Sequence, residues 1–563
     1  MAYPAAMTET PAPSSADAPA RFALRRLRPD PWSLGAGLIA ALVLVPILAV
    51  VWMGFFPTEN IWPHLLATTL PRYFRTTVIL MLSVGVLAGA VGTGAAWLVT
   101  MYRFPGRRWI QWALFLPLAI PAYVGAYALV DFLEYAGPVQ RALRALFGWQ
   151  SARDYAFPEV RSLGAAIVVL AAALYPYVYL LARAAFREQS GGTYEVARAL
   201  GAGPWRRFFR VGLPLARPAV AAGMAVAMME TVNDFGTVNY FAVQTLTTGI
   251  FTVWLEQFNA GGAAQIALVI LGLVLLLALL ERAGRRGLRF HRVARQTRPV
   301  TPEPLFGARG WLAAGLCLLP FVMGFVLPIG VIASHAASSS EGWADPGLFR
   351  AAFNTVLTGG IAAFVTVAAA LFMVYGVRLS GRRVPRLLLP ITTIGYAAPG
   401  AVLAVGVLIP LAAADHKLAD GILALTGTDP GLILTGSAFA VVYAWGVRFF
   451  AIAQGAADGA MGRVSPSLPM AARSLGRTRR GVLSSVYLPL IRGSVGTALL
   501  LVFVDCVKEL PATLILRPFG FDTLATRTYE KASLENLTDA APAALMVSAV
   551  GLAAVVLLAR THR

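Results

Sequence analysis

The chain has 563 residues, of which 58% are hydrophobic and only 13% are charged, about half the charged fraction of an ordinary soluble protein. The apolar residues come in long blocks, which argues against a soluble enzyme, a disordered chain and a disulfide-stabilised scaffold. Cys317 and Cys506 are the only cysteines, so we expect neither a disulfide framework nor a cysteine-type zinc site. The net charge of +20 would suit nucleic acid, but the positions of the charges argue against that interpretation.

Residues 1–31 are predicted to form a cytoplasmic N-terminal tail with four arginines, and its first 20 residues are Ala/Pro/Ser-rich and lack the apolar region of a cleavable signal peptide. A membrane helix needs about 20 mostly apolar residues. Twelve segments of the chain meet this requirement: 32–56, 75–101, 109–133, 162–186, 216–243, 263–281, 310–334, 353–377, 385–412, 431–454, 491–516 and 540–560. The sequence therefore predicts an all-α polytopic membrane protein.

Arginine placement gives the expected orientation of these spans. Cytoplasmic loops of membrane proteins carry an excess of Lys and Arg. Beyond the N-terminal tail, every second loop here is basic, with arginines clustered at 103–108, 187–210, 282–298, 378–386, 463–480 and 560–563. We therefore expect a multi-pass protein of a bacterial inner membrane with both termini in the cytoplasm. The excess positive charge is then explained by the basic cytoplasmic loops that orient the spans, and no nucleic-acid partner is expected.

The two halves of the chain resemble each other at a fixed offset of 275 residues. Shared features include an Ala-Arg pair, a Leu-Gly pair and a Leu-Pro-Leu triplet in each half, and the acidic Glu230 falls opposite Asp505. These matches predict a first repeat at 32–281, a basic cytoplasmic linker at 282–309 and a second repeat at 310–563. Each repeat holds six spans, so both enter the membrane in the same direction. Transporter substrate paths lie where such repeats meet.

A second shared feature is a patterned cytoplasmic loop, at about 187–215 in the first repeat and about 463–490 in the second. Each copy is predicted to be a short helix of small residues, a glycine stop, a second basic helix and a Leu-Pro where the next span begins. Small side chains on an exposed helix allow another protein to approach closely. The residues that define the pattern are Glu195, Ala197, Gly201, Leu213 and Pro214 in the first copy and Met470, Ala472, Gly476, Leu488 and Pro489 in the second.

This pattern resembles the "EAA" loop of binding-protein-dependent ABC importer permeases. In that family the loop forms a coupling helix that sits in a groove of the ATP-binding subunit. The resemblance implies the type I ABC importer permease fold, two copies of a cytoplasmic ATP-binding subunit, a periplasmic substrate-binding protein and a lipid bilayer as partners. The ten loop residues are then the predicted ATPase-coupling residues. Because Met470 stands where the first copy has Glu195, we expect the first loop to be the more sensitive to substitution.

The stretches 230–241, 247–251, 508–514 and 517–526 resemble those of ferric-iron importer permeases. The resemblance covers most of the chain from the first span onward, including the fused two-repeat layout. It implies a permease subunit that conducts ferric iron. Related fused permeases carry thiamine, phosphonates or polyamines, and these substrates stay open as alternatives.

The chain is not expected to be an enzyme. A phosphate-binding loop requires Gly-Lys-Ser/Thr, and none of the three lysines stands in that context, so ATP is expected to be used by a separate subunit. The five histidines show no metal-ligand spacing, and neither a metal site nor another cofactor is predicted. A twelve-span secondary transporter is the main alternative class, and the duplicated loops argue against it. A membrane-embedded enzyme or scaffold is another, which the duplication and the lack of a catalytic cluster in the sequence disfavour.

Ionisable groups near the ends of two spans form the last predicted site. Glu230 and Asp234 are four residues apart, as are Asp505 and Glu509, so each pair is predicted to share one helical face. Ionisable groups in membrane spans usually face an aqueous interior. The predicted translocation path comprises Glu230, Asn233, Asp234, Asp505, Lys508 and Glu509. Two interpretations stay open: these side chains line a periplasmic gate, or they pair with each other and cap the ends of spans.

Overall fold

The computed structural model describes residues 31–57, 59–286, 300–380, 383–393, 395 and 398–561. Residues 1–30 of the predicted tail and 287–299 of the predicted linker lie outside the described residues. The chain is almost entirely helical, and its only β-structure in the described residues is one parallel pair formed by β1 (Tyr102–Arg103) and β2 (Glu303–Pro304). This pair joins the end of the second span to the segment that precedes the second half.

The first half contains α1 (Pro31–Phe55), α2 (Trp62–Ala67), α3 (Leu70–Met101), α4 (Arg107–Ala113), η1 (Leu116–Ala119), α5 (Ala122–Leu133), α6 (Pro138–Phe147), α7 (Leu163–Arg187), α8 (Gly191–Ala199), α9 (Pro204–Arg207), η2 (Phe208–Gly212), α10 (Leu213–Asn233), α11 (Gly236–Tyr240), α12 (Leu246–Phe251), η3 (Thr252–Glu256) and α13 (Ala260–Arg286). The second half contains α14 (Gly307–Phe321), η4 (Val322–Val326), α15 (Leu327–Ser338), α16 (Ser340–Ala344), α17 (Pro346–Ser380), α18 (Arg383–Ile391), α20 (Gly400–Thr426), α21 (Phe439–Gly462), α22 (Ser467–Ser474), α23 (Arg479–Val482), η5 (Leu483–Tyr487), α24 (Leu488–Lys508), α25 (Pro511–Leu516), α26 (Leu524–Ser533) and α27 (Leu537–Thr561). The element η1 is a 3₁₀ turn, and η2 to η5 are π-helical turns.

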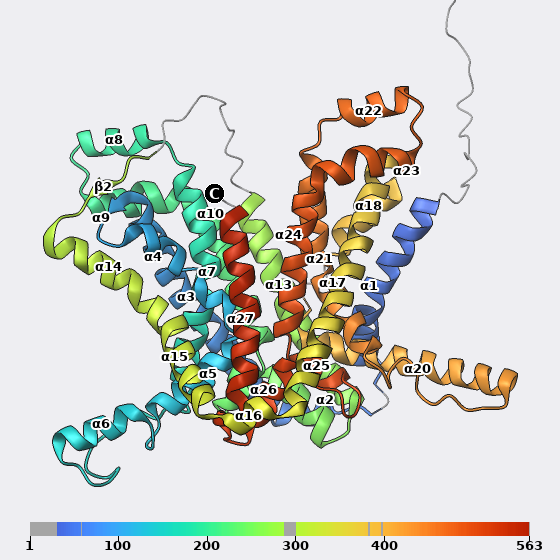
Figure 1. Ribbon diagram of the computed structural model, residues 1–563, viewed down its shortest axis with the longest axis horizontal. Coiled ribbons are helices and arrows are strands. Elements are labelled where there is room, and N and C mark those ends of the chain that lie inside the picture. Colours follow the sequence, from blue (N-terminus) through green and yellow to red (C-terminus); the bar gives the residue numbers. More distant parts are fainter. Residues whose placement is uncertain are drawn as a thin grey trace, which may run out of the picture.

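Within the described residues, eleven helices are long and apolar enough to cross a membrane, and a bent pair at Arg107–Ala119 and Ala122–Phe147 brings the number to twelve. The two halves stand side by side, with α8 and α22 at the same end and α2, α16 and α26 at the other (Figure 1). Both halves therefore run through the bundle in the same direction. The predicted all-α membrane architecture in two parallel repeats is confirmed.

The duplication extends to individual hydrogen bonds. The hydroxyl of Thr77 accepts a bond from the backbone N–H of Leu246 at 2.9 Å. In the second half, the hydroxyl of Thr355 accepts from the N–H of Leu524 at 2.8 Å. In each half the bond ties a short helix after the fifth span to the second span, so the two repeats share local tertiary structure as well as topology.

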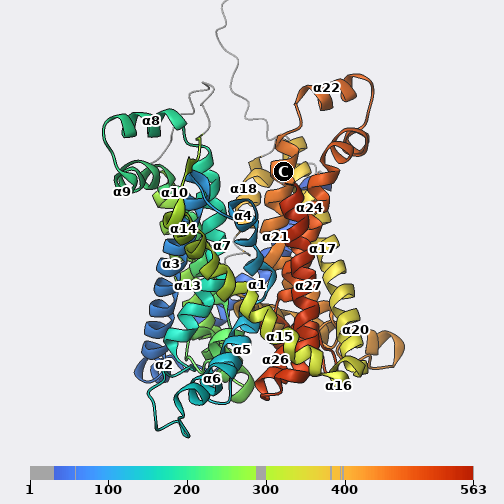
Figure 2. The ribbon, with the colours of Figure 1, turned by 60° about the vertical axis from the view of Figure 1, so that its left-hand side comes forward.

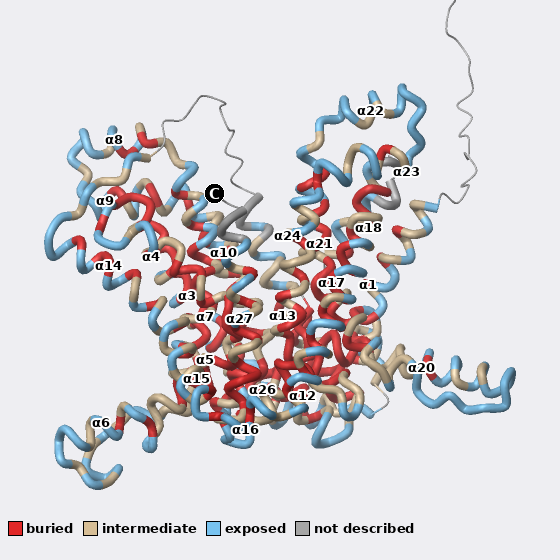
Figure 3. The backbone as a smooth tube through the Cα atoms, viewed as in Figure 1, coloured by how far each residue is buried: buried red, intermediate tan, exposed pale blue. Residues whose placement is uncertain are grey.

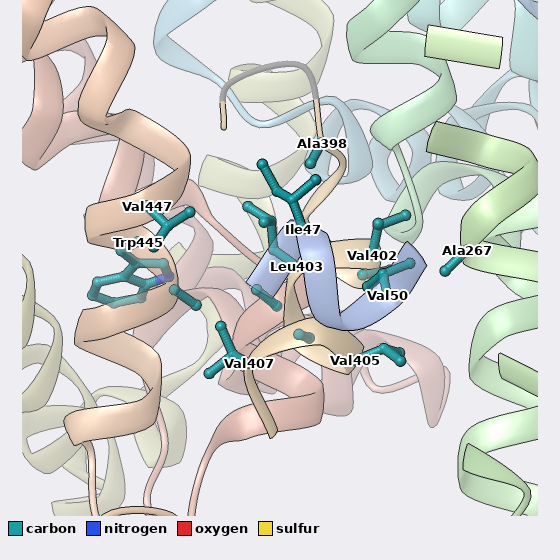
Figure 4. Close-up of a cluster of buried hydrophobic side chains, with 14 of the residues drawn as sticks. Ile47, Val50, Ala267, Ala398, Val402, Leu403, Val405, Val407, Trp445 and Val447 are labelled. Atoms are coloured by element: carbon teal, nitrogen blue, oxygen red, sulfur yellow. The ribbon is translucent and has the colours of Figure 1, made fainter. Parts of the chain in front are cut away.

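The first helix of each half packs against the other half. Helix α1 lies against α17 and α20 of the second half, and α14 packs on α3 and α4 of the first. Ile47 and Val50 of α1 meet Leu403 and neighbouring valines of α20 in the largest buried cluster (Figure 4). The two helices approach so closely that a Cβ on Gly406 would lie 2.2 Å from the carbonyl oxygen of Pro46. Buried residues fill the middle of the bundle, whereas α8 and α22 are largely exposed (Figure 3).

Four of the predicted spans differ from the structure: two are broken, and two end earlier than expected. The predicted spans 109–133 and 385–412 are broken at Pro121 and Pro399, which stand immediately before α5 and α20; a proline lacks the backbone N–H and disfavours helical conformation in the residue before it. The bend between the two parts of the first is 97°. The predicted spans 216–243 and 491–516 end earlier than expected, since α10 stops at Asn233 and α24 at Lys508.

Candidate functional site

All six residues of the predicted path line one cavity of about 170 Å³ between the two halves. Its walls come from the break between η1 and α5, from α7 and α21, and from the ends of α10 and α24. Four acidic side chains face two basic ones there, because Arg448 of α21 joins Lys508 among the lining residues. The structure therefore brings together two groups of residues that are 275 positions apart in the sequence.

Glu509 lies at the centre of a buried hydrogen-bond network. Its side chain is only 1% exposed and forms an ion pair with Arg448 at 2.8 Å. The indole N–H of Trp445 donates to the same carboxylate at 3.1 Å. At the start of α25, Ala512 N, Thr513 N and Thr513 Oγ1 also donate to it. Glu509 thus caps α25 while it neutralises a buried arginine.

Asp234, at the equivalent position of the first half, has a simpler role. Its carboxylate accepts from the N–H groups of Thr237 and Val238 and from the Thr237 hydroxyl, so it caps α11. Asp234 and Glu509 have extended backbone conformations just beyond the ends of α10 and α24. The prediction that each acidic pair shares one helical face is therefore wrong for these two residues, because the helix ends one residue before each of them.

The last residues of α10 and α24 form reciprocal bonds between the halves. Asn233 Oδ1 accepts from the backbone N–H of Gly400, the first residue of α20, at 2.8 Å. Lys508 Nζ donates to the carbonyl oxygen of Leu118 in η1 at 2.7 Å. Asn233 and Lys508 are equivalent positions, and both partners lie at the break of the other half's third span. The fifth span of each half is thus attached to the broken span of the other.

Gly400 also explains why α20 can begin beside the network of Glu509. A Cβ at this position would lie 2.5 Å from both Arg448 Nη1 and Glu509 Oε1, so only glycine fits without rearrangement. The N-terminus of a helix carries partial positive charge, which favours the nearby carboxylate. The break in the third span, the ion pair and the cross-half bond of Asn233 therefore form one connected structure.

Sequence reasoning missed Arg448 and Trp445. An arginine within an otherwise apolar span is itself a marker of a functional or paired position, so Arg448 was detectable from the predicted span 431–454. Its pairing with Glu509 was not, because 61 residues separate them. In the described residues, no group of three His, Cys, Asp or Glu side chains lies close enough together to hold a metal ion.

The two patterned loops have the predicted geometry. Helices α8 and α22 end at glycines in the left-handed region, Gly201 with φ of 78° and Gly476 with φ of 81°. Nothing lies within 4 Å of a Cβ built at either glycine, so backbone conformation rather than space requires glycine. Pro214 and Pro489 stand in the first turns of α10 and α24, which the missing N–H of proline permits.

The loop surfaces expose apolar side chains at the end of the molecule. Leu200 is 81% exposed and the equivalent Leu475 is 83% exposed. Beside them, Val196 on α8 and Met470 on α22 are also exposed. Glu195 is exposed on α8, while Ala197 and Ala472 are partly buried. A soluble segment that presents such a surface is suited to contact with another protein.

The two loops differ in how they attach to the body. Glu303 of β2 accepts hydrogen bonds from Arg207 of α9 and, at 3.3 Å, from Arg198 of α8. The hydrogen bond from Arg207 holds the pKa of Glu303 below its ordinary value. Helix α8 also buries Tyr194, whereas α22 has no buried residue. The first loop is therefore anchored to the segment that joins the halves.

Comparison with known proteins agrees with this arrangement. Residues 81–289 match the family described as "Binding-protein-dependent transport system inner membrane component". The chain is 26% identical over 483 residues to the Fe(3+)-transport system permease protein FbpB 2 of Haemophilus influenzae, with 84% of this chain and 86% of that protein covered. It is 28% identical over 267 residues to the sulfate transport system permease protein CysT of Escherichia coli, with 45% of this chain and 93% of that protein covered.

The molybdenum transport system permease protein ModB of Escherichia coli is 28% identical over 205 residues, with 34% of this chain and 86% of that protein covered. The similarity to the Fe(3+) permease thus extends over both halves, whereas the sulfate and molybdenum permeases match less than half of this chain. The predicted resemblance to a fused two-repeat permease is confirmed. These relatives are transport permeases rather than enzymes.

Proposed function

We propose that this permease subunit of an ABC importer forms the path by which ferric iron crosses the bacterial inner membrane. The observation that carries the proposal is the acidic cavity between the halves, on which all six predicted path residues converge. Carboxylate oxygens are suitable ligands for a hard cation, whereas sulfate and molybdate are oxyanions that acidic walls repel. The extent of similarity supports the same choice, because the Fe(3+) permease matches along both halves.

The energy for transport comes from separate ATPase subunits. We assign one copy to each patterned loop, so that α8 and α22 each present an exposed leucine, Leu200 and Leu475, to an ATPase groove. This end of the molecule is then cytoplasmic, and it also holds the start of α1 and the C-terminus (Figure 1). A periplasmic binding protein delivers the substrate to the opposite end.

The assignment of the docking surfaces is tested by co-purification. The full chain is expressed with the ATPase that purifies with it, and Leu200→Asp and Leu475→Asp are compared with Phe519→Asp, an equally drastic change at a fully exposed side chain outside both loops. We expect each leucine variant to lose one ATPase copy and the double variant to lose both. Retention of both copies by the double variant would contradict the assigned surfaces.

The assignment of the substrate is tested by uptake. Proteoliposomes that contain the chain and its ATPase, with ATP on the ATPase side and the cognate binding protein on the other, are supplied with radioactive ferric iron, sulfate or molybdate. We expect ATP-dependent uptake of iron alone, and none with the double loop variant. Uptake of an oxyanion instead of iron would reject ferric iron, and uptake without the ATPase would favour a secondary transporter.

A further inference from the structure

Two helical arms project sideways from the end of the molecule opposite α8 and α22. The first arm comprises α6 and the return segment to residue 159, and the second comprises the distal part of α20 and the return segment, residues 411–436. Both arms run across the direction of the spans (Figure 1, Figure 2). Each continues from the broken third span of its half, so the arms are equivalent features of the two repeats.

Each arm is held in shape by its own polar contacts. In the first, Gln140 donates to the carbonyl oxygen of Leu133 at 2.7 Å and accepts from the hydroxyl of Tyr155 at 2.5 Å, so it joins the helix to both its root and its return segment. In the second, the carboxylate of Asp415 accepts from the N–H groups of Ile433, Leu434 and Thr435 and from the Thr435 hydroxyl. Asp415 is the only buried residue of the distal part of α20. Side-chain hydrogen bonds therefore hold each arm in a defined conformation.

The arms nevertheless expose large apolar side chains. Leu146 and Phe147 at the end of α6 are 76% and 58% exposed. In the second arm, Leu425 is 89% exposed, and Leu423 and Leu432 are 44% and 51% exposed. Apolar groups gathered on projecting helices are unfavourable in water and mark a surface that is covered.

The apolar surface of the spans points to what covers the arms. Trp52, Phe55 and Phe56 at the end of α1 are about two-thirds exposed, as are other outward-facing residues along that helix. Helix α1 runs from the end that holds α22 toward the end that holds the arms (Figure 1). Tryptophan and tyrosine concentrate where a bilayer meets water, so the exposed Trp52 marks this end of α1 as the interface. The arms leave the body at the same end, and their apolar surface continues that of the spans.

We propose that both arms are interfacial anchors that lie in the headgroup layer of the leaflet opposite the coupling loops. Amphipathic helices in this layer lie in the plane of the membrane and bury their apolar face at the edge of the acyl chains. The first arm carries three arginines and two acidic residues, a net charge of +1, whereas the second carries Lys417 and three aspartates, a net charge of −2. Since the arms differ in charge but share exposed apolar residues, apolar burial rather than attraction to anionic lipid is the common basis of anchoring.

Anchoring affects the path itself. The arms continue from α5 and α20, whose N-termini lie beside Leu118 and at Gly400, the residues that bond to Lys508 and Asn233. An arm fixed in the membrane plane holds the distal end of its broken span. Movement within that span is then concentrated at the break, next to the cavity.

The proposal is tested by measuring the depth of spin labels. The full chain is reconstituted in vesicles of pure phosphatidylcholine with single labels at Leu146→Cys and Leu425→Cys. The native Cys317 and Cys506 are buried and give little background. Leu38→Cys, on the outward face of α1, serves as the lipid control, and Arg477→Cys, in the second coupling loop, serves as the water control.

We expect both arm labels to be several-fold more accessible to oxygen than to a water-soluble nickel chelate, relative to the Arg477→Cys label, and to lie between the two controls. The same result is expected when anionic lipid is added. Arm labels that match the Arg477→Cys control would place the arms in water and overturn the proposal. Insertion that requires anionic lipid would overturn its apolar basis.

Discussion

The network of Glu509 gives a prediction that separates the two interpretations of the path residues. Glu509→Ala removes a carboxylate that is 1% exposed and leaves the side chain of Arg448, 10% exposed, without its ion-pair partner. It also removes the acceptor for the N–H groups of Ala512 and Thr513, and one of two acceptors each for the Trp445 indole and the Thr513 hydroxyl. The structure therefore predicts a loss of stability, whatever the effect on transport.

The expected size follows from the burial of the pair. Removing one partner of a buried ion pair costs about 3–5 kcal/mol, because an uncompensated charge stays behind. Replacing both partners by apolar residues of similar volume is often neutral or stabilising. We therefore expect Glu509→Ala to be severely destabilised and the double variant Arg448→Met with Glu509→Leu to recover much of the loss. Asp234→Ala, which removes only a helix cap, should cost about 1 kcal/mol.

Both cysteines are buried, so a thiol-reactive fluorescent dye reports unfolding of the purified protein as the temperature rises. Apparent midpoints are compared among variants in the same detergent, since unfolding of a large membrane protein is governed by rate and is not a simple equilibrium. Transport is measured in parallel. An unchanged midpoint for Glu509→Ala with loss of transport would refute the structural role of Glu509 and assign it to the path.

Three further predictions concern the loops and the contacts between halves. Gly201→Ala and Gly476→Ala should each strain the loop, because both glycines have positive φ. Each variant should insert normally but bind less ATPase in co-purification, and full ATPase binding would contradict this. Lys508→Met should remove a bond between the halves and raise ATP hydrolysis in the absence of the binding protein, and basal hydrolysis at the wild-type rate would contradict that role. Glu303→Gln should increase the mobility of a fluorophore on α8 at neutral pH, since Arg207 lowers the pKa of Glu303. The carboxylate contributes its full stability above its ordinary pKa and loses it as the pH falls through the lowered pKa. As the pH falls through the lowered pKa the wild type should become as mobile as the variant, and a difference that persists in acid would show that charge is not the cause.

The parts of the fold that the sequence predicts are those governed by local chemistry. The number of spans follows from the length of the apolar segments, whereas the orientation expected from arginine placement stays a prediction. The loop helices follow from small residues and from the glycine stops at Gly201 and Gly476, whose positive φ values explain why glycine is needed there. Such features depend on residues close together in the chain.

The parts that escaped prediction depend on contacts between distant residues. The span predicted at 385–412 stops before the polar residues Asp415, His416 and Lys417, whereas α20 continues through them to Thr426 and its distal part projects from the bundle (Figure 1). Spacing placed Asp234 and Glu509 on helical faces, but the capped helices α11 and α25 begin there instead. Only the assembled structure shows that Glu509 meets Arg448, or that Asn233 reaches Gly400.

The two repeats share a framework but differ where they contact each other and the proposed ATPases. At the cavity, Asn233 accepts a bond from the second half, whereas the equivalent Lys508 donates one to the first. At the loops, α8 is tied to β2 through Glu303, while α22 has no buried residue. A single symmetric motion would strain these unequal contacts unequally. We therefore expect the second loop to move first relative to the body, while the first loop, attached to the segment that joins the halves, transmits force to both.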